Sequence, residues 1–155
     1  MIKYTIIVSV ILGLLSCQKA ENVRFNEEVS WIEQYVSSHS LIGYQIRETG
    51  IFIVHDHRSN LDLSPTLNND LDVVLDLSCK DAVHQTVFFE LATDTLAVDD
   101  LIHGLKIGLT HTSIGDSVQL YVPSRLAYGE EGLDNIPANT ILKFDIYLSD
   151  IHPHF

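Results

Sequence analysis

The sequence predicts an α+β fold in which an antiparallel sheet wraps around one short helix. Segments with apolar residues at every second position lie both before and after a single internal segment with helical spacing. Stretches with glycine, proline, asparagine or aspartate separate these segments. Strands placed on both sides of one helix along the chain favour a sheet packed on that helix. With 155 residues, the chain is long enough for one domain with its own core.

The first 16 residues have the layout of a signal peptide. Lys3 precedes an apolar run over 5–15, and Ser16 and Cys17 end that run. A helix of this length spans about 16 Å, roughly half of a bilayer's hydrocarbon core. A targeting segment is therefore favoured over a transmembrane helix.

The motif that ends this segment, Leu14-Leu15-Ser16-Cys17, resembles the lipobox of bacterial lipoproteins. In a lipobox the cysteine receives a diacylglyceryl group and becomes the new N-terminus after cleavage, so the resemblance implies lipidation of Cys17 and a lipid bilayer as partner. Several acyl chains hold a protein on a membrane where one chain does not. The alternative is an ordinary secretory signal with a coincidental cysteine.

The residues after the cysteine, 18–21, lack the aspartate that retains enteric lipoproteins at the inner membrane. We therefore expect a lipid-anchored protein of the cell envelope, at the outer membrane. With Cys17 acylated, Cys79 has no cysteine to pair with, and it is expected as a small buried apolar side chain on a strand.

A short amphipathic helix is expected after the anchor, from Asn26 as N-cap to about Ser37. Its apolar positions at helical spacing are Val29, Ile32 and Val36. Trp31 and Tyr35, four residues apart, are expected to pack on each other. This gives a signal peptide over 1–16, a tether with a short helix over 17–43, and one domain over 44–155.

The strands of that domain follow from period-two alternation and from the turns between them. They are expected at 44–47, 51–54, 71–77, 87–91, 118–122 and 142–148. The segment 59–70, rich in asparagine, serine and aspartate, is expected as a loop. The central helix is expected from Val98 to Leu109, capped by Asp99 and Asp100, and Gly104 and Gly108 shorten it.

The charge balance limits the partners. The chain has 21 acidic against 9 basic residues and a formal net charge of -12. Such a surface repels a polyphosphate backbone, and no cluster of Lys and Arg compensates for it. Nucleic acid is therefore not expected as a partner.

The segment from Leu101 to Asp145 carries a pattern specific enough to compare with a known family. Its elements are Leu101-Ile102-His103-Gly104-Leu105, Gly108-Leu109, Gly115-Asp116, Ala127-Tyr128-Gly129, Ile136-Pro137 and Phe144-Asp145. This segment resembles the C-terminal half of an FKBP-type peptidyl-prolyl cis-trans isomerase domain. The layout of lipobox, short helix and one such domain is similar to gliding-motility-associated FKBP-type lipoproteins.

The resemblance implies a site made mainly of apolar side chains that rotates Xaa-Pro bonds in protein substrates without a cofactor or a metal. It implies four catalytic positions: Tyr128, whose hydroxyl faces the substrate carbonyl, Ile102, which also offers a backbone donor, Leu105 and Phe144. It further implies substrate contacts from Leu77, Phe88, Leu96, Leu101 and Ile136. Because Ile102, Ile136 and Phe144 fit any packed core of this fold, Tyr128 is the residue that discriminates a site from a core.

The first half of the site departs from the family pattern. Leu105 stands where the family has a tryptophan floor, and Phe88-Phe89 stands where it has Phe-Asp, with Glu90 next along. A shift of one residue on a strand reverses the face on which a side chain lies. Two alternatives to an isomerase stay open. One is the same fold acting as a catalytically weak binding or chaperone module, and the other is an acidic β-rich lipoprotein of unrelated fold.

The histidines offer no metal site of known spacing. His55 and His57 share a strand face, and His152 and His154 end the chain, but no third and fourth ligand accompany either pair. They are expected as solvated histidines at strand ends and in the tail, and His103 and His111 as exposed residues on or after the helix.

Overall fold

The computed structural model describes residues 2–67 and 71–153, with side chains from residue 20 onward. Its described strands form one antiparallel sheet in the order β1-β2-β5-β6-β3-β4. Their bounds are β1 Gly43–Gln45, β2 Phe52–His57, β3 Leu71–Asp81, β4 Val87–Ala97, β5 Ser117–Val122 and β6 Leu142–Pro153. The helices are α1 Ile2–Ser38 and α2 His103–Leu109, with 3₁₀ turns η1 Val98–Asp100 and η2 Ser124–Leu126.

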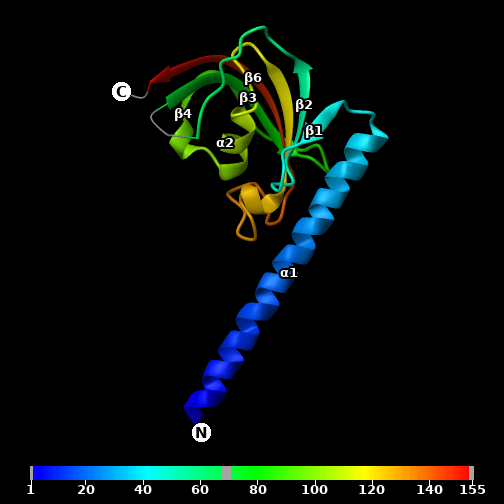
Figure 1. The fold of residues 1–155 in the computed structure, drawn as a ribbon, viewed down its shortest axis with the longest axis vertical. Coiled ribbons are helices and arrows are strands. Elements are labelled where there is room, and N and C mark those ends of the chain that lie inside the picture. The colour runs from blue at the N-terminus through cyan, green and yellow to red at the C-terminus, as the bar shows by residue number, and fades with distance from the viewer. Residues whose placement is uncertain (1, 68–70, 154–155) are drawn as a thin grey trace.

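The sheet curves around α2, as Figure 1 shows, and this confirms the predicted α+β architecture. Alternation places one face of β2, β3, β5 and β6 in the core cluster that also contains Leu105 and Leu109 of α2. On β3, Leu75, Leu77 and Cys79 are buried, whereas the residues between them are partly exposed. Cys79 is a free buried cysteine, as predicted.

Two glycines let α2 approach the sheet closely. A Cβ atom on Gly108 would overlap the buried side chain of Leu120 on β5. A Cβ atom on Gly104 would overlap the Val122 side chain and lie 3.0 Å from the carbonyl oxygen of Leu126. The absence of a side chain at these positions therefore sets how deeply the helix sits in the curve of the sheet.

The predicted central helix from Val98 to Leu109 is wrong at its start. Val98–Asp100 forms the separate turn η1, Leu101 and Ile102 are extended, and α2 begins only at His103. Asp99 and Asp100 do not cap α2, because the extended pair stands between them and the helix. The backbone carbonyl of Asp99 instead accepts a 2.6 Å hydrogen bond from Lys106 Nζ.

The N-terminal helix also differs from its prediction. Asn26 is not an N-cap but lies inside α1, which runs continuously over Ile2–Ser38. The sequence between the apolar run and Asn26 contains good helix formers such as Gln18, Lys19 and Ala20 and no proline, so nothing stops the helix there. No helix in the described part of the chain combines the length and the apolarity that crossing a bilayer requires.

The C-terminal part of α1 packs on the outer face of the sheet, opposite α2. Ile32 and Val36 are buried in one cluster with Val54 of β2 and Tyr121 of β5. The rings of Trp31 and Tyr35 stack with centroids 5.0 Å apart, and Tyr35 also contacts Tyr121. The predicted packing pair is confirmed, and Figure 1 shows the rest of α1 projecting away from the domain.

We expect Gly104→Ala to lower the free energy of unfolding by about 1–3 kcal/mol, because overpacking against Val122 and Leu126 outweighs the helix propensity that alanine adds. Urea unfolding measures the change, and His103→Ala, at an exposed position of the same helix, serves as the control with a change within about 0.5 kcal/mol. A more stable Gly104→Ala protein would contradict this close packing.

Candidate functional site

The nine residues predicted for the site lie in one cluster on the concave face of the sheet. Four are buried within it and five pack against it while remaining partly exposed. The buried residues are Leu77 of β3, Leu105 of α2, Ile136 of the β5–β6 connection and Phe144 of β6. The partly exposed ones are Phe88, Leu96, Leu101, Ile102 and Tyr128. The structure therefore brings together residues that come from five separate parts of the chain.

The base of this cluster is held by the sheet register. Phe144 lies in the centre of the sheet, paired with Cys79 of β3 on one side and Leu120 of β5 on the other. Leu105 stands above this layer, on the helix that the two glycines bring close to β5. Because these side chains are fully packed, the base of the site is apolar and dry.

Ile102 combines an apolar side chain with a free backbone donor. Its backbone is extended, with ψ near 151°, and it is the N-cap of α2. The carbonyl oxygen of Ile102 accepts hydrogen bonds of 3.1 Å from the amides of Leu105 and Lys106. Its own N–H has no hydrogen-bond partner among the described residues. Since the residue is partly exposed, this N–H is available to a ligand carbonyl.

Tyr128 provides a second free donor at the rim of the cluster. The carbonyl oxygen of Ser124 accepts 2.9 Å hydrogen bonds from the amides of Ala127 and Gly129, the two neighbours of Tyr128. Gly129 has φ of +57°, a conformation that glycine adopts without strain. The Tyr128 hydroxyl has no hydrogen-bond partner within the described chain.

Burial raises the pKa of Tyr128, and the nearby Cys79 thiol acts in the same direction. The Tyr128 hydroxyl is therefore protonated at neutral pH and can donate a hydrogen bond.

The register of β4 decides which side chains of the Phe88-Phe89-Glu90 segment reach the site. Phe89 pairs with Cys79 and so shares its face, whereas Glu90 pairs with Ser78 on the opposite face. Phe88 falls where the register shifts, between the pairs Cys79–Phe89 and Lys80–Val87. Phe89, which the sequence prediction did not assign to the site, is therefore on its inner face, and β4 supplies no carboxylate at the position expected for the family acid.

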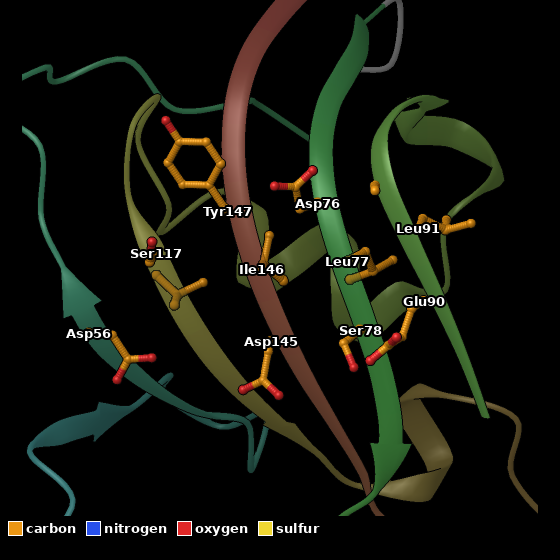
Figure 2. Close-up of a pocket in the computed structure, with 12 residues that line it drawn as sticks. Asp56, Asp76, Leu77, Ser78, Glu90, Leu91, Ser117, Asp145, Ile146 and Tyr147 are labelled. Carbon is orange, nitrogen blue, oxygen red and sulfur yellow. The ribbon is translucent and has the colours of Figure 1, made fainter. Parts of the chain in front are cut away.

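Glu90 instead lines a groove on the outer face of the sheet, shown in Figure 2. This groove has a volume of about 510 Å³, and its acidic lining residues are Asp56, Asp76, Glu90 and Asp145. Burial alone would raise the pKa of Asp145, but hydrogen bonds from Lys143 and Lys80 outweigh it and hold this pKa below its usual range. Of the nine predicted site residues, only Leu77 contributes to this lining.

The described residues contain no group of three or more His, Cys, Asp or Glu side chains that could hold a metal ion. His57 and His152 are exposed as predicted, as are His103 and His111, whereas His154 lies outside the described residues.

The prediction of a solvated His55 is wrong. Its side chain is 9% exposed, and neither ring nitrogen has a hydrogen-bond partner in the part of the chain that the structure describes. The ring of Tyr44 on β1 stacks over it, and Asp116 Oδ2 lies 3.7 Å from Nδ1, too far for a hydrogen bond.

The comparison with family models gives a match over residues 66–149, more than half of the chain, to FKBP-type peptidyl-prolyl cis-trans isomerases. A relative from Buchnera aphidicola, the FKBP-type peptidyl-prolyl cis-trans isomerase FkpA, is 44% identical over 57 residues. That alignment covers 37% of this chain and only 24% of the relative's length.

Two crystal structures share the fold. A peptidyl-prolyl cis-trans isomerase from Pseudomonas syringae superposes with a TM-score of 0.68 at 18% identity, over 84% of this chain and 95% of its own. FkpA from Escherichia coli gives a TM-score of 0.65 at 21% identity, over 98% of this chain and 72% of its own. The fold is thus that of a prolyl isomerase domain, and the alternative of an unrelated acidic β-rich fold is wrong. The chain belongs to the FKBP-type peptidyl-prolyl cis-trans isomerase family.

The burial of His55 predicts a pH dependence of stability. Burial lowers the pKa of His55, and Arg58 and His111 add to this effect, while Asp116 and Asp56 oppose it. Below about pH 6.5 the unfolded chain then binds more protons than the folded one. The contribution of neutral His55 to the free energy of unfolding is therefore complete above this pH and is lost as the pH falls.

We expect the free energy of unfolding to fall between pH 7.5 and pH 5, with a contribution from His55 of at most about 1.4 kcal/mol per pH unit. Urea unfolding across this range should show a shallower dependence for His55→Phe and an unchanged one for His57→Phe, at an exposed position of the same strand. Equal slopes for the wild type and His55→Phe would contradict the assignment.

Proposed function

We propose that this protein is a peptidyl-prolyl cis-trans isomerase that acts on Xaa-Pro bonds of extracytoplasmic proteins and is anchored to a membrane through a lipid on Cys17. The observation that carries the enzymatic part is that an otherwise apolar cluster holds two donors, the Tyr128 hydroxyl and the Ile102 N–H, which pair with none of the described residues. Membership of the isomerase family supports the same activity.

The chemistry needs neither a nucleophile nor a cofactor. Rotation about an Xaa-Pro bond crosses a barrier of about 18–20 kcal/mol, because amide resonance is lost as the bond twists. An apolar environment around the prolyl ring removes water from the planar, polar amide. The packed base of Leu105, Phe144 and Ile136 supplies this environment.

The donors lower the barrier further if they bind the twisted amide better than the planar one. In this proposal Tyr128 donates to the substrate carbonyl whose bond rotates, and the Ile102 N–H holds a neighbouring carbonyl of the peptide. The remaining predicted residues, Leu77, Phe88, Leu96 and Leu101, with Phe89 added from the register, contact the residues around the proline.

The lipid anchor rests on the lipobox-like motif that ends at Cys17. Together with the absence of aspartate directly after the cysteine, it supports a place in the cell envelope, at the outer membrane. The proposed arrangement of lipid, helix and isomerase domain is similar to gliding-motility-associated FKBP-type lipoproteins.

A second candidate function is a binding or chaperone module with little or no catalysis. It is favoured by one observation, the register that turns Glu90 to the outer face and leaves Phe89 on the inner one. An additional aromatic side chain in place of an acid gives a site suited to holding apolar extended chain rather than to polarising a carbonyl.

An exchange measurement on a proline peptide separates the two candidates. The full chain in mild detergent should accelerate cis-trans exchange of a short Xaa-Pro peptide, followed by NMR. We expect Tyr128→Phe to reduce kcat/KM about tenfold through loss of one donor, and Leu105→Ala to reduce it as well by opening the dry base. Ser30→Ala, at an exposed position of α1, is the control and should leave the rate unchanged.

Exchange at the background rate with high protein concentration would exclude the isomerase. Retained binding of the peptide in the same sample, seen as shifts of its resonances, would then favour the binding module.

The anchor has its own test. Mass spectrometry of the protein purified from bacterial membranes should find an N-terminal Cys17 carrying a diacylglyceryl group, and Cys17→Ser should release the protein from the membrane fraction. A mature chain that begins at another residue, or an unmodified Cys17, would contradict this part of the proposal.

A further inference from the structure

The helix α1 contacts the chain segment that carries Tyr128, and one contact is a buried carboxylate. Glu28 is only 7% exposed, and its carboxyl group accepts two hydrogen bonds from the same residue. The backbone N–H of Ser124 donates at 2.7 Å, and the Ser124 hydroxyl donates at 2.6 Å. A buried carboxylate is costly without such partners, so this pair fixes α1 and Ser124 relative to each other.

Ser124 is the first residue of η2, where a backbone N–H has no partner inside the turn. The preceding residue, Pro123, makes no side-chain cap. Glu28 therefore replaces a local cap with one supplied from 96 positions away in the chain.

The same serine holds the backbone on both sides of Tyr128. Its carbonyl oxygen accepts the amides of Ala127 and Gly129, each at 2.9 Å. A continuous line of hydrogen bonds thus runs from Glu28 through Ser124 to the two neighbours of the catalytic tyrosine. The position of Ser124 therefore constrains the backbone on both sides of Tyr128.

A second set of contacts joins α1 to residues 129–139, on the C-terminal side of Tyr128. Arg24, one turn before Glu28, donates to Glu130 Oε1 at 2.7 Å and to Asn139 Oδ1 at 2.6 Å. The backbone N–H of Asn139 donates to the carbonyl oxygen of Gly129 at 2.7 Å. Neighbouring Phe25 lies under the guanidinium of Arg125, 3.1 Å from its ring centroid.

A cavity of about 120 Å³ remains between α1 and the segment, and Arg24, Glu28 and Arg125 contribute to its lining. Arg24 and Arg125 thus bring positive charge to the lining of this cavity.

We propose that Glu28 is a positioning residue of the prolyl site, which orients Tyr128 through Ser124, and that Arg24 supports it from the other side. This inference rests on the proposed isomerase function. It makes α1 a part of the catalytic unit rather than a spacer between the membrane and the domain.

The test compares three variants of the full chain in mild detergent. Glu28→Ala removes both acceptors, whereas Glu28→Gln keeps an oxygen for the Ser124 N–H and offers an amide to its hydroxyl. Ile32→Ala, one turn further along α1, loosens the packing of the same helix without touching Ser124. All are measured at a temperature at which urea titrations show them to be fully folded.

We expect Glu28→Ala to lower kcat about tenfold with less than a threefold change in KM, because a displaced Tyr128 loses an interaction with the twisted bond. Glu28→Gln should stay within about threefold of the wild type, and so should Ile32→Ala per folded molecule, even though it lowers stability. NMR shifts of the Ala127, Tyr128 and Gly129 amides should move in Glu28→Ala and not in Ile32→Ala.

An equal loss of activity in Glu28→Ala and Ile32→Ala would show a general effect of helix docking and overturn the proposal. So would unchanged Tyr128 and Gly129 amides in Glu28→Ala. If the wild type itself shows no isomerase activity, the proposed function fails, but the amide shifts still decide whether Glu28 positions the Tyr128 segment.

Discussion

The close packing of α2 on β5 is the contact on which the site depends. Because Gly104 and Gly108 carry no side chains, the helix axis can lie against Val122 and Leu120. This depth places Leu105 at the base of the site and the extended Ile102 at its rim, where no described residue pairs with the Ile102 N–H. The sheet must curve to enclose a helix at this distance, and its neighbouring strands β6 and β3 then bring Phe144 and Leu77 to the same base. A larger residue at either glycine would act on every part of this arrangement at once.

Those parts of the fold that have one buried and one exposed face were predictable from the sequence. The last strand was predicted over 142–148. Its buried and exposed residues alternate because one face lies in the core around α2 and the other does not. Helix ends were predicted less well. Asn26 has the side-chain chemistry of an N-cap, but an N-cap starts a helix only where the residues before it are not helical. The residues before Asn26 are helical and continue α1. The break at Ile102 depends likewise on packing against the sheet, which local spacing does not record.

The residues of the site likewise differ in how far the sequence could predict them. Tyr128 lies in a local motif, Ala127-Tyr128-Gly129, whose resemblance to the family pattern makes its segment predictable from the sequence. The roles of Phe89 and Glu90 depend on a register shift in β4, which moves side chains between faces without a fixed sequence signal. His55 is buried because Tyr44, from another strand, covers it. The contact between Glu28 and Ser124 joins residues that are far apart in sequence, and a glutamate on an amphipathic helix would ordinarily be assigned to the solvent-exposed face.

The continuity of α1 has a geometric consequence for where such a protein can work. A flexible linker would let the domain sample a wide volume above the bilayer, whereas a continuous helix holds the domain at one distance from the end of the helix. From Cys17 to Glu28 the helix rises only about 16 Å at 1.5 Å per residue. With a lipid on Cys17, the helix would hold the prolyl site at a set distance from the anchored residue and so close to the headgroups. The prolyl site could then reach only a thin layer next to the membrane. Its substrates would be polypeptide chains that emerge from that surface or lie along it.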